Sequence, residues 1–182
     1  MSHLQIFHAG DAAGSAPRES FRDPTQIRDS LGERGIGFER WSARVEIPAE
    51  ATEAEILEAY APEITRVQAS GRFPTVDAIR LRPDHPEREG LRRKFLDEHT
   101  HGEDEVRFFV EGRGLFCLHI GEEVLLMLCE TNDFLRVPAG IRHWFDMGSA
   151  PCFTAIRFFD NPEGWVAQFT GDPISNRFPL LD

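Results

Sequence analysis

The spacing of apolar residues changes near residue 99, and the half of the chain that follows is patterned for strands. Short runs rich in β-branched and aromatic residues follow one another there, separated by glycine, proline and acidic residues. The runs are EVRFFVEGRG, LFCLHIGEEVLLMLCE, FLRVPAGIRHWFDMG and PCFTAIRFF. Several short strands at this spacing predict an all-β barrel or sandwich.

The N-terminal half mixes strand and helix patterns. Strands are expected at residues 3–8, 36–47 and 75–82, and helices at residues 24–33, 52–68 and 85–96. Asp23 before Pro24 is a helix start signal, and Thr52 followed by Glu55 resembles a capping box. These helices would surround the strand-rich half rather than interrupt it.

Length and composition predict one folded domain. The chain has 182 residues, of which 41% are hydrophobic and 15 are phenylalanine, enough to bury a sizeable core. No linker separates the two halves. We therefore predict a single, mainly β domain over residues 1–182, in which the strand and helices of about residues 1–98 pack on the barrel.

Net charge and cysteine content limit which binding partners and which cellular compartment are expected. The net charge of −11 disfavours nucleic acid and anionic membranes, because both require a basic face. No segment has the pattern of a secretory signal or approaches the ~18 apolar residues of a membrane helix. Cys117, Cys129 and Cys152 do not form a disulfide framework. We predict a cytoplasmic protein, and the acidic surface is compatible with a monomer.

The stretch HTHGEDE, residues 99–105, holds the first candidate chemistry. His99, His101 and Glu105 share parity, so an extended chain would point them the same way, with a small turn between His101 and Glu105. His143 lies on a later β segment and would come alongside if the sheet closes. Three imidazoles and one carboxylate suit Fe²⁺, Ni²⁺, Mn²⁺, Cu²⁺ or Zn²⁺.

Each part of this pattern also has a plain structural interpretation. HTHGEDE alone could be a solvated acidic loop, and His143 alone could be a histidine of the core or surface. The combination of HxH, a following glutamate and PxGxxH on a β-rich background is much more specific than its parts. It favours a metal site.

The same residues resemble the two metal motifs of the cupin superfamily. HxHxxxExxxxxxG and PxGxxH are both present, and their residues are His99, His101, Glu105, Gly112, Pro138, Gly140 and His143. Three flanking positions depart from the usual pattern. Arg93 and Asn132 stand where glycines are usual, although Asn132 also tolerates left-handed backbone, and Met147 stands where asparagine is usual. The ligand positions are untouched.

A longer stretch, at least residues 75–169, resembles the acireductone dioxygenase family. The residues between the ligands fit as well as the ligands do, in FLDEHTHGEDEVRFFVEGRGLF, FLRVPAGIRHWFDMG and AIRFF. The resemblance implies a cupin-type β-barrel, or jelly roll, with peripheral helices. It also implies a dioxygenase of methionine salvage that carries one Fe²⁺ or Ni²⁺ per chain.

The substrates implied by the resemblance are O₂ and the enediol 1,2-dihydroxy-3-keto-5-methylthiopentene. With Fe²⁺ the family makes formate and 2-keto-4-methylthiobutyrate. With Ni²⁺ it makes methylthiopropionate, formate and carbon monoxide. The same four ligands serve both ions, so the sequence leaves the metal, and therefore the products, open.

Carried over by position, the resemblance assigns roles around the metal. The ligands are His99, His101, Glu105 and His143. Asp104 is the candidate base that helps to form the substrate dianion, and Glu98 is a neighbour of the first ligand that aids metal loading. The plain alternative for Asp104 is a solvated turn aspartate, and Glu98 has the alternative of no part in the site.

Further candidates follow from parity and position. Arg107 has the parity of the ligands, and Arg157 would lie on a neighbouring strand, so either guanidinium could pair with the anionic substrate. Phe95, Phe145 and Trp165 could form a pocket for the methylthio tail. Surface ion pairs and core packing are the alternatives for these residues.

Two other functions remain open at this point. The four ligands would also serve a different cupin oxygenase or isomerase, and a non-catalytic cupin could use the barrel to bind a small ligand. His119, in LFCLHIG, lies outside the motifs and is interpreted as a structural or surface histidine.

Overall fold

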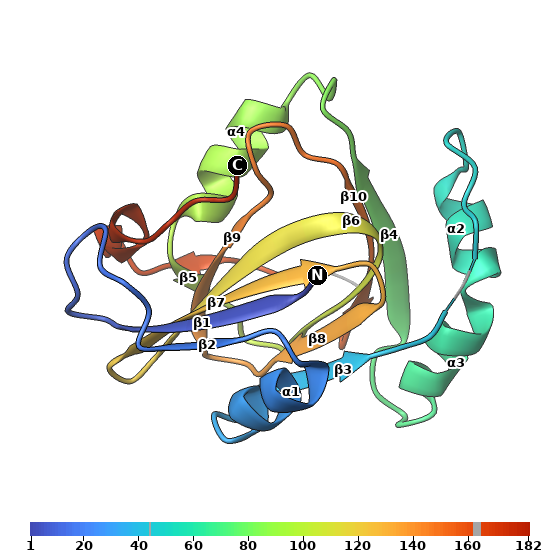
Figure 1. Cartoon of the computed structure of the whole chain (residues 1–182). Coiled ribbons are helices and arrows are strands. Elements are labelled where there is room, and N and C mark those ends of the chain that lie inside the picture. The colour runs from blue at the N-terminus through green and yellow to red at the C-terminus, as the bar shows by residue number, and fades with distance from the viewer. Residues whose placement is uncertain (44, 162–164) are drawn as a thin grey trace.

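A computed structural model describes residues 1–43, 45–161 and 165–182, and these form a strand-rich body with helices around it (Figure 1). The strands are β1 (His3–His8), β2 (Glu19–Phe21), β3 (Gly37–Arg40), β4 (Thr75–Leu81), β5 (His99–Thr100), β6 (Glu105–Ile120), β7 (Glu123–Glu130), β8 (Asp133–Val137), β9 (Arg142–Asp146), β10 (Phe153–Phe159) and β11 (Gln168–Phe169).

The long strand β6 joins two curved sheets. Its first half pairs with β10 and β8, which in turn pair with β4 and β3. Its second half pairs with β7 and β9, in a path that runs β11–β5–β9–β6–β7–β1–β2. This is the mainly β, jelly-roll architecture that was predicted, although the ladders of the described residues do not close into a ring.

Gly112 marks the point where β6 passes from one sheet to the other. Its φ of +68° is left-handed, and a Cβ built there would lie 1.8 Å from the carbonyl oxygen of Cys152. Only glycine fits both conditions. Asn132, which follows β7, also has a left-handed φ of 79°, as the sequence suggested it could.

The main core lies between the two sheets. Phe109, Phe116, Phe145 and Phe153 meet there, and the rings of Phe116 and Phe145 lie 4.9 Å apart. All four are almost fully buried, and burying one such ring contributes roughly 1.5–3 kcal/mol. Phe145 also lines a cavity of about 220 Å³, so the core supports the wall of that cavity directly.

The helices lie on the outside of the sheets. They are α1 (Pro24–Gly32), α2 (Glu53–Ala59), α3 (Ala61–Gln68) and α4 (Arg88–Leu96), with a 3₁₀ turn η1 (Pro173–Arg177). In Figure 1, α2 and α3 stand beside β4, α1 lies by β3, and α4 lies near β9. The expected N-terminal signals are present. Asp23 caps α1 by accepting from the backbone of Thr25 and Gln26, and Thr52 forms a capping box with Glu55.

Two predicted elements differ in the structure. The helix expected over 52–68 is divided at Tyr60, whose ψ of 20° interrupts the helix just before Pro62. The strand expected over 36–47 ends at Arg40, because its partner β8 begins at Asp133, opposite Arg40. Residue 44 of that prediction lies outside the described residues.

Strands of the N-terminal half pair with strands of the C-terminal half. β1 lies beside β7 along its whole length, and β3 lies beside β8.

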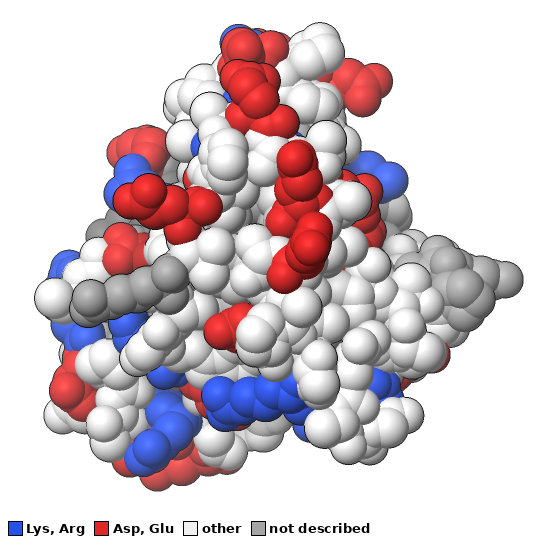
Figure 2. All heavy atoms as spheres, turned by 90° about the vertical axis from the view of Figure 1, so that its right-hand side faces the viewer, with Lys and Arg blue, Asp and Glu red and all other residues white. Residues whose placement is uncertain are grey.

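Figure 2 shows the face that carries α2, where acidic side chains gather on the upper part. Glu53, Glu55 and Glu58 of α2 are exposed. Among the helices that the structure describes, none is long and apolar enough to cross a membrane.

Candidate metal centre

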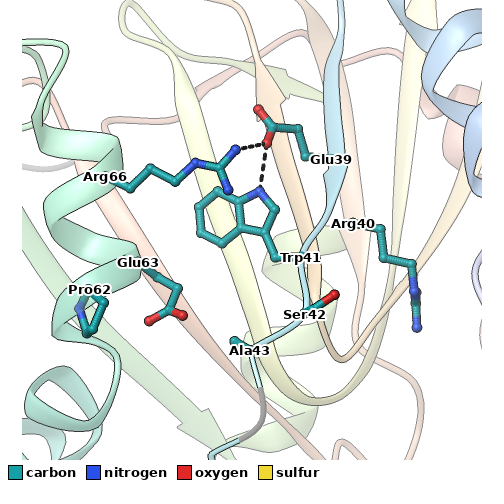
Figure 3. Close-up of a pocket in the computed structure, with 8 residues that line it drawn as sticks. All are labelled: Glu39, Arg40, Trp41, Ser42, Ala43, Pro62, Glu63 and Arg66. Atoms are coloured by element: carbon teal, nitrogen blue, oxygen red, sulfur yellow. Dashed lines mark hydrogen bonds and ion pairs between the residues drawn. The ribbon is translucent and has the colours of Figure 1, made fainter.

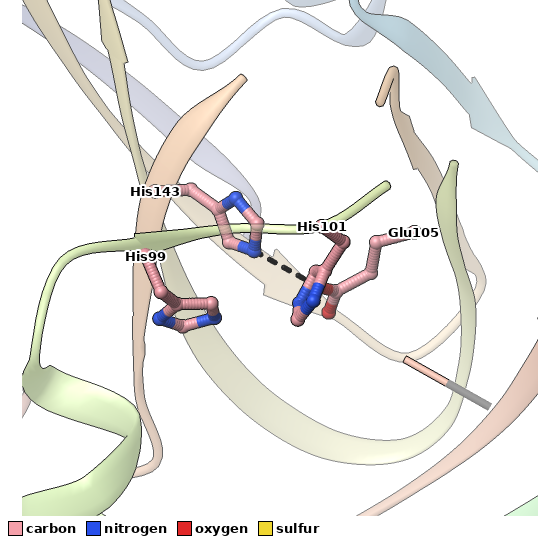
Figure 4. A group of neighbouring side chains, drawn as sticks. All are labelled: His99, His101, Glu105 and His143. Atoms are coloured by element: carbon pink, nitrogen blue, oxygen red, sulfur yellow. Dashed lines mark hydrogen bonds and ion pairs between the residues drawn. The ribbon is translucent and has the colours of Figure 1, made fainter. Parts of the chain in front are cut away.

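The four side chains predicted as ligands come together in the structure (Figure 4). His99 lies on β5, His101 follows that strand, Glu105 begins β6 and His143 lies on β9. One donor atom from each lies within 4.8 Å of the others, and all four residues are buried. The solvated-loop interpretation of HTHGEDE therefore does not describe these side chains.

Local backbone structure explains the convergence. His99 is paired directly with His143 in the antiparallel ladder of β5 and β9, which places both rings on one face. The chain then bends at Gly102 and Glu103, and Glu105 enters β6. This bend is the turn expected between the second histidine and the glutamate.

Each histidine has one ring nitrogen directed at a backbone carbonyl. The Nδ1 atoms lie 2.7 Å from Asp97 O, 3.1 Å from Val166 O and 2.9 Å from Ile141 O, for His99, His101 and His143 respectively. A carbonyl only accepts, so each Nδ1 carries the proton and donates. The neutral rings then have unprotonated Nε2 atoms, which is how histidines are prepared to bind a metal.

The Nε2 atoms meet a carboxylate rather than a donor. Oε2 of Glu105 lies 3.0 Å from Nε2 of His143 and 3.1 Å from Nε2 of His101. Two lone pairs that face each other at such a distance require a proton or a cation between them. Oε1 of Glu105 is also buried without a hydrogen bond. The donor set therefore fits a divalent first-row metal.

Burial and charge shift the pKa values of three of the four candidate ligands. Burial and the neighbouring His143 lower the pKa of His99 to about 4. Burial alone would raise the pKa of Glu105, but Arg107 and the two histidines hold it well below its usual value. Burial also opposes protonation of His101, and there the Glu105 carboxylate outweighs it and raises the pKa. The net result is one carboxylate anion facing imidazole nitrogens.

Arg107 is the buried cation of the site. Its Nε lies 2.8 Å from Oε1 of Glu105, yet neither atom makes an aligned hydrogen bond among the described residues. The guanidinium lies 4.8 Å from the ring centroid of Phe145 and 5.3 Å from that of Trp165. Burial lowers the pKa of Arg107 from its ordinary value, while Glu105 opposes that shift. Arg107 therefore places a buried positive charge beside the Glu105 carboxylate.

A cavity of about 220 Å³ opens onto these groups. It is lined by all four candidate ligands and by five of the seven residues predicted around them, which are Phe95, Arg107, Phe145, Arg157 and Trp165. Lys94, Ala167 and Phe169 also line it and were not predicted. Phe169 could not have been found from its own neighbourhood, because it reaches the site only by pairing with His99 across β11 and β5.

Arg157 lines the cavity while it forms an ion pair. Its guanidinium donates twice to Asp77, at 2.6 and 2.8 Å, and lies 5.7 Å from the ring centroid of Trp165. The plain alternative, an ion pair, is therefore present, and the same side chain still contributes positive charge to the cavity wall.

Asp104 does not line this cavity among the described residues. Its carboxylate accepts from Arg136 at 2.7 Å and from the backbone N–H of Ala139 at 3.0 Å, and Arg72 lies 3.2 Å away. Burial would raise its pKa, but the Ala139 N–H and the two arginines lower it. These contacts anchor the start of β6 and make Asp104 a weak proton acceptor in this conformation.

Glu98 lies outside the cavity lining as well. It is 1% exposed, and its carboxylate accepts from Nδ1 of His119 at 2.7 Å and from the hydroxyl of Thr170 at 2.8 Å. His119 is itself buried. This fits the structural interpretation of that histidine and not the surface one. Glu98 is therefore a paired, buried acid and not a surface glutamate.

A larger hollow of about 510 Å³ lies between the end of β3 and α3 (Figure 3). Three of its polar groups pair with one another, since Glu39 accepts from Nε1 of Trp41 at 2.7 Å and from Arg66 at 2.6 Å. The Arg66 guanidinium covers the Trp41 ring at 4.7 Å. No histidine or cysteine is among its described lining residues, so the candidate chemistry lies in the smaller cavity.

Comparison with known proteins agrees with the geometry of the site. A family model described as the ARD/ARD' family matches residues 5–167. The chain belongs to the ARD/ARD' family. Among its relatives, the acireductone dioxygenase of Prochlorococcus marinus (strain MIT 9313) is 62% identical over 184 residues and covers 100% of both chains. That of Synechococcus sp. (strain RCC307) is 60% identical over 183 residues, covering 100% of this chain and 99% of the relative.

A solved structure of another protein is similar in fold to this chain. It is an acireductone dioxygenase from Bacillus anthracis with a cadmium ion in its active centre. It superposes with a TM-score of 0.78 at 27% sequence identity, and the match covers 93% of this chain and 98% of that chain. The family resemblance inferred from the sequence motifs is confirmed.

Proposed function

We propose that this protein is a metal-dependent acireductone dioxygenase of methionine salvage. The substrates would be O₂ and the enediol 1,2-dihydroxy-3-keto-5-methylthiopentene. The observation that carries the proposal is the buried set of three imidazoles and one carboxylate in a cavity that also holds Arg107 and Arg157. Relatives about 60% identical over the whole chain, all named acireductone dioxygenase, support it.

The cofactor we propose is one Fe²⁺ or Ni²⁺ per chain. The residues that would hold it are His99, His101, Glu105 and His143. When bound, the dication stabilises negative charge on the substrate oxygens. With iron we expect formate and 2-keto-4-methylthiobutyrate, and with nickel methylthiopropionate, formate and carbon monoxide.

The protein's own side chains would hold the charged substrate. Arg107 and Arg157 line the cavity, and Arg107 is buried, where a guanidinium attracts an oxyanion more strongly than in bulk solvent. Phe95, Phe145 and Trp165 form an apolar wall of the cavity that suits a methylthio tail. We infer that the cations orient the enediol end and the aromatic rings orient the tail.

Asp104 remains our candidate base on the family resemblance alone, because its contacts with Arg136 and Ala139 oppose that role. The Asp104→Asn variant separates the two roles. A loss of about 100-fold in kcat with the metal content retained would support the base. An unchanged kcat would leave Asp104 as an anchor for the start of β6.

Metal analysis and product identification test the proposed function. The purified protein should contain close to one first-row metal per chain, and it should consume O₂ when the enediol is added. After reconstitution, the nickel form should release carbon monoxide and the iron form should not. Turnover of a different substrate would favour another cupin oxygenase or isomerase. Protein without metal or oxygen uptake would favour a non-catalytic cupin.

We further propose that the enzyme works as a cytoplasmic monomer. The net charge of −11 supports the monomer, because copies of a strongly acidic chain repel one another. Light scattering at working concentration tests the oligomeric state, and a dimer mass would contradict it. Fractionation of the source cells tests the compartment.

A further inference from the structure

A trio of polar side chains lies next to the metal cluster without belonging to it; Glu98 and His119 are buried and Thr170 is exposed. The Glu98 carboxylate accepts from Nδ1 of His119 at 2.7 Å on one oxygen and from the Thr170 hydroxyl at 2.8 Å on the other. The side chain of Glu98 has no solvent exposure, and that of His119 has 6%. Burying such a group is costly unless it is fully hydrogen-bonded, and here both oxygens have donors.

The trio joins three segments that are distant in sequence. His119 lies on β6, Glu98 immediately precedes the ligand His99, and Thr170 immediately follows β11. The backbone adds a second connection, because the N–H of Thr170 donates to the carbonyl of Glu98 at 3.0 Å. Thr170 is therefore bound to Glu98 through both its backbone and its side chain.

The segment that Thr170 ends is the cover of the cavity. We call residues 165–170 the cover segment; Trp165, Ala167 and Phe169 in it line the cavity. The carbonyl of Val166, in the same segment, accepts from Nδ1 of His101. The position of this short piece of chain therefore sets one wall of the cavity and one contact of a candidate ligand.

The cover segment has little else to hold it at this end. The ladder between β11 and β5 has only two residue pairs, Gln168 with Thr100 and Phe169 with His99. Phe169 is 51% exposed, so apolar burial secures it only in part. Two-stranded pairing of this length is not stable by itself. The hydroxyl of Thr170 adds a charge-assisted hydrogen bond to Glu98 at this end.

We propose that Thr170, Glu98 and His119 form a latch that fixes the cover segment, and that Thr170 and His119 are positioning residues for substrate binding. Glu98 receives both donors, and His119 holds the carboxylate in the orientation that Thr170 needs. The part concerning substrate rests on the proposed function. The part concerning the latch rests on the geometry alone.

The direct test replaces the hydroxyl with a methyl group of nearly the same size. In Thr170→Val, amide hydrogen exchange of the cover segment should be about tenfold faster than in the wild type, because a hydrogen bond to a charged group is lost. Thr170→Ser keeps the hydroxyl and should restore slow exchange. Thr65→Val, the same substitution on an exposed face of α3, is the matched control and should change nothing in the cover segment.

Steady-state kinetics of the metal-loaded holoenzyme test the positioning role. We expect KM for the enediol to rise about fivefold in Thr170→Val with a smaller change in kcat, since the wall is loosened while the metal donors remain. Metal content should stay near one per chain. In a double-mutant cycle with Glu98→Gln, which removes the charge of the acceptor, the two effects should be clearly non-additive, because both weaken the same contact.

Several outcomes would overturn the latch. The first is an amide exchange rate in Thr170→Val equal to that of the wild type. The second is an equal increase of the exchange rate in Thr170→Val and Thr170→Ser. The third is strict additivity of the effects in the double-mutant cycle. Faster exchange with an unchanged KM would overturn the positioning role. If the wild type does not turn over the enediol, the proposed function fails and the positioning role fails with it. The exchange measurements, which need no substrate, then still decide whether the latch exists.

Discussion

His99 of β5 lies directly opposite His143 of β9, and their ring centroids are 4.5 Å apart. This pairing is the structural link between the two sequence motifs. It brings a histidine from HTHGEDE and a histidine from VPAGIRHWF onto one face of a sheet. The remaining two donors follow from it, because the bend at Gly102 and Glu103 returns the chain to the same cavity at Glu105.

Removal of one member of that pair should abolish stable metal binding. We expect His143→Ala to lower metal affinity by at least ~100-fold, because a ligand matters at least as much as an outer contact. Metal analysis after dialysis measures the effect. His85→Ala, a histidine outside the cavity lining, is the control and should keep a full complement. Full metal content in His143→Ala would contradict the ligand assignment.

Arg107 should matter both for stability and for substrate. Arg107→Met removes the cation paired with the buried Glu105 carboxylate. We expect the metal-free protein to lose about 3 kcal/mol of unfolding free energy, and the metal-loaded protein to lose less, because the metal then compensates the charge.

The same variant should also lose substrate affinity. With metal bound, kcat/KM for the enediol should fall by about 100-fold if the guanidinium holds the anionic substrate. Chemical denaturation with and without metal, together with oxygen-uptake kinetics, measures both effects. An unchanged kcat/KM would assign Arg107 to charge balance alone.

The bend in β6 should tolerate no side chain at Gly112. Gly112→Ala places a Cβ against the carbonyl oxygen of Cys152, in addition to the left-handed backbone cost of about 1 kcal/mol. Gly14→Ala is the matched control, since Gly14 also has a left-handed φ, of +84°, but has nothing within 4 Å of its Cβ position. We expect Gly112→Ala to be about 3 kcal/mol less stable than the control by denaturant unfolding. Equal stabilities would show that β6 can bend elsewhere.

Acid should weaken the pairing of β4 with β10 through Glu111. Burial would raise the Glu111 pKa, but Thr154 and the Arg80 and Arg82 guanidinium groups hold it below its usual value. A lowered folded-state pKa means stability that is present above the unfolded value and is lost as pH falls through the folded one.

The Glu111→Gln variant tests the direction of this pH dependence of stability. We expect it to cost roughly 1 kcal/mol at pH 7, a modest figure because the pair is partly exposed. The difference from the wild type should shrink as the pH falls below the ordinary carboxyl range. A difference that is constant between pH 7 and pH 3 would assign the effect to packing instead of charge.

The positions of strands and helices were predictable where the pattern is local. Strand 3–8 is β1 as predicted, and the caps at Asp23 and Thr52 are present, because they depend on residues close in sequence. The end of β3 at Arg40 was not predictable, since the start of its partner β8 sets it. The single-domain organisation over residues 1–182 remains a prediction, supported by the pairing of β1 with β7.

The sequence by itself determined the donor set. HxH, the following glutamate and PxGxxH specify which imidazoles and which carboxylate the chain can offer, and parity specifies which of them share a face. The tertiary structure decided part of what surrounds that set. Phe169 reaches the site through strand pairing, and the buried carboxylate of Glu98 is satisfied because His119 and Thr170 donate to it. Contacts between segments distant in sequence depend on the closure of the fold, which leaves no local periodicity to read.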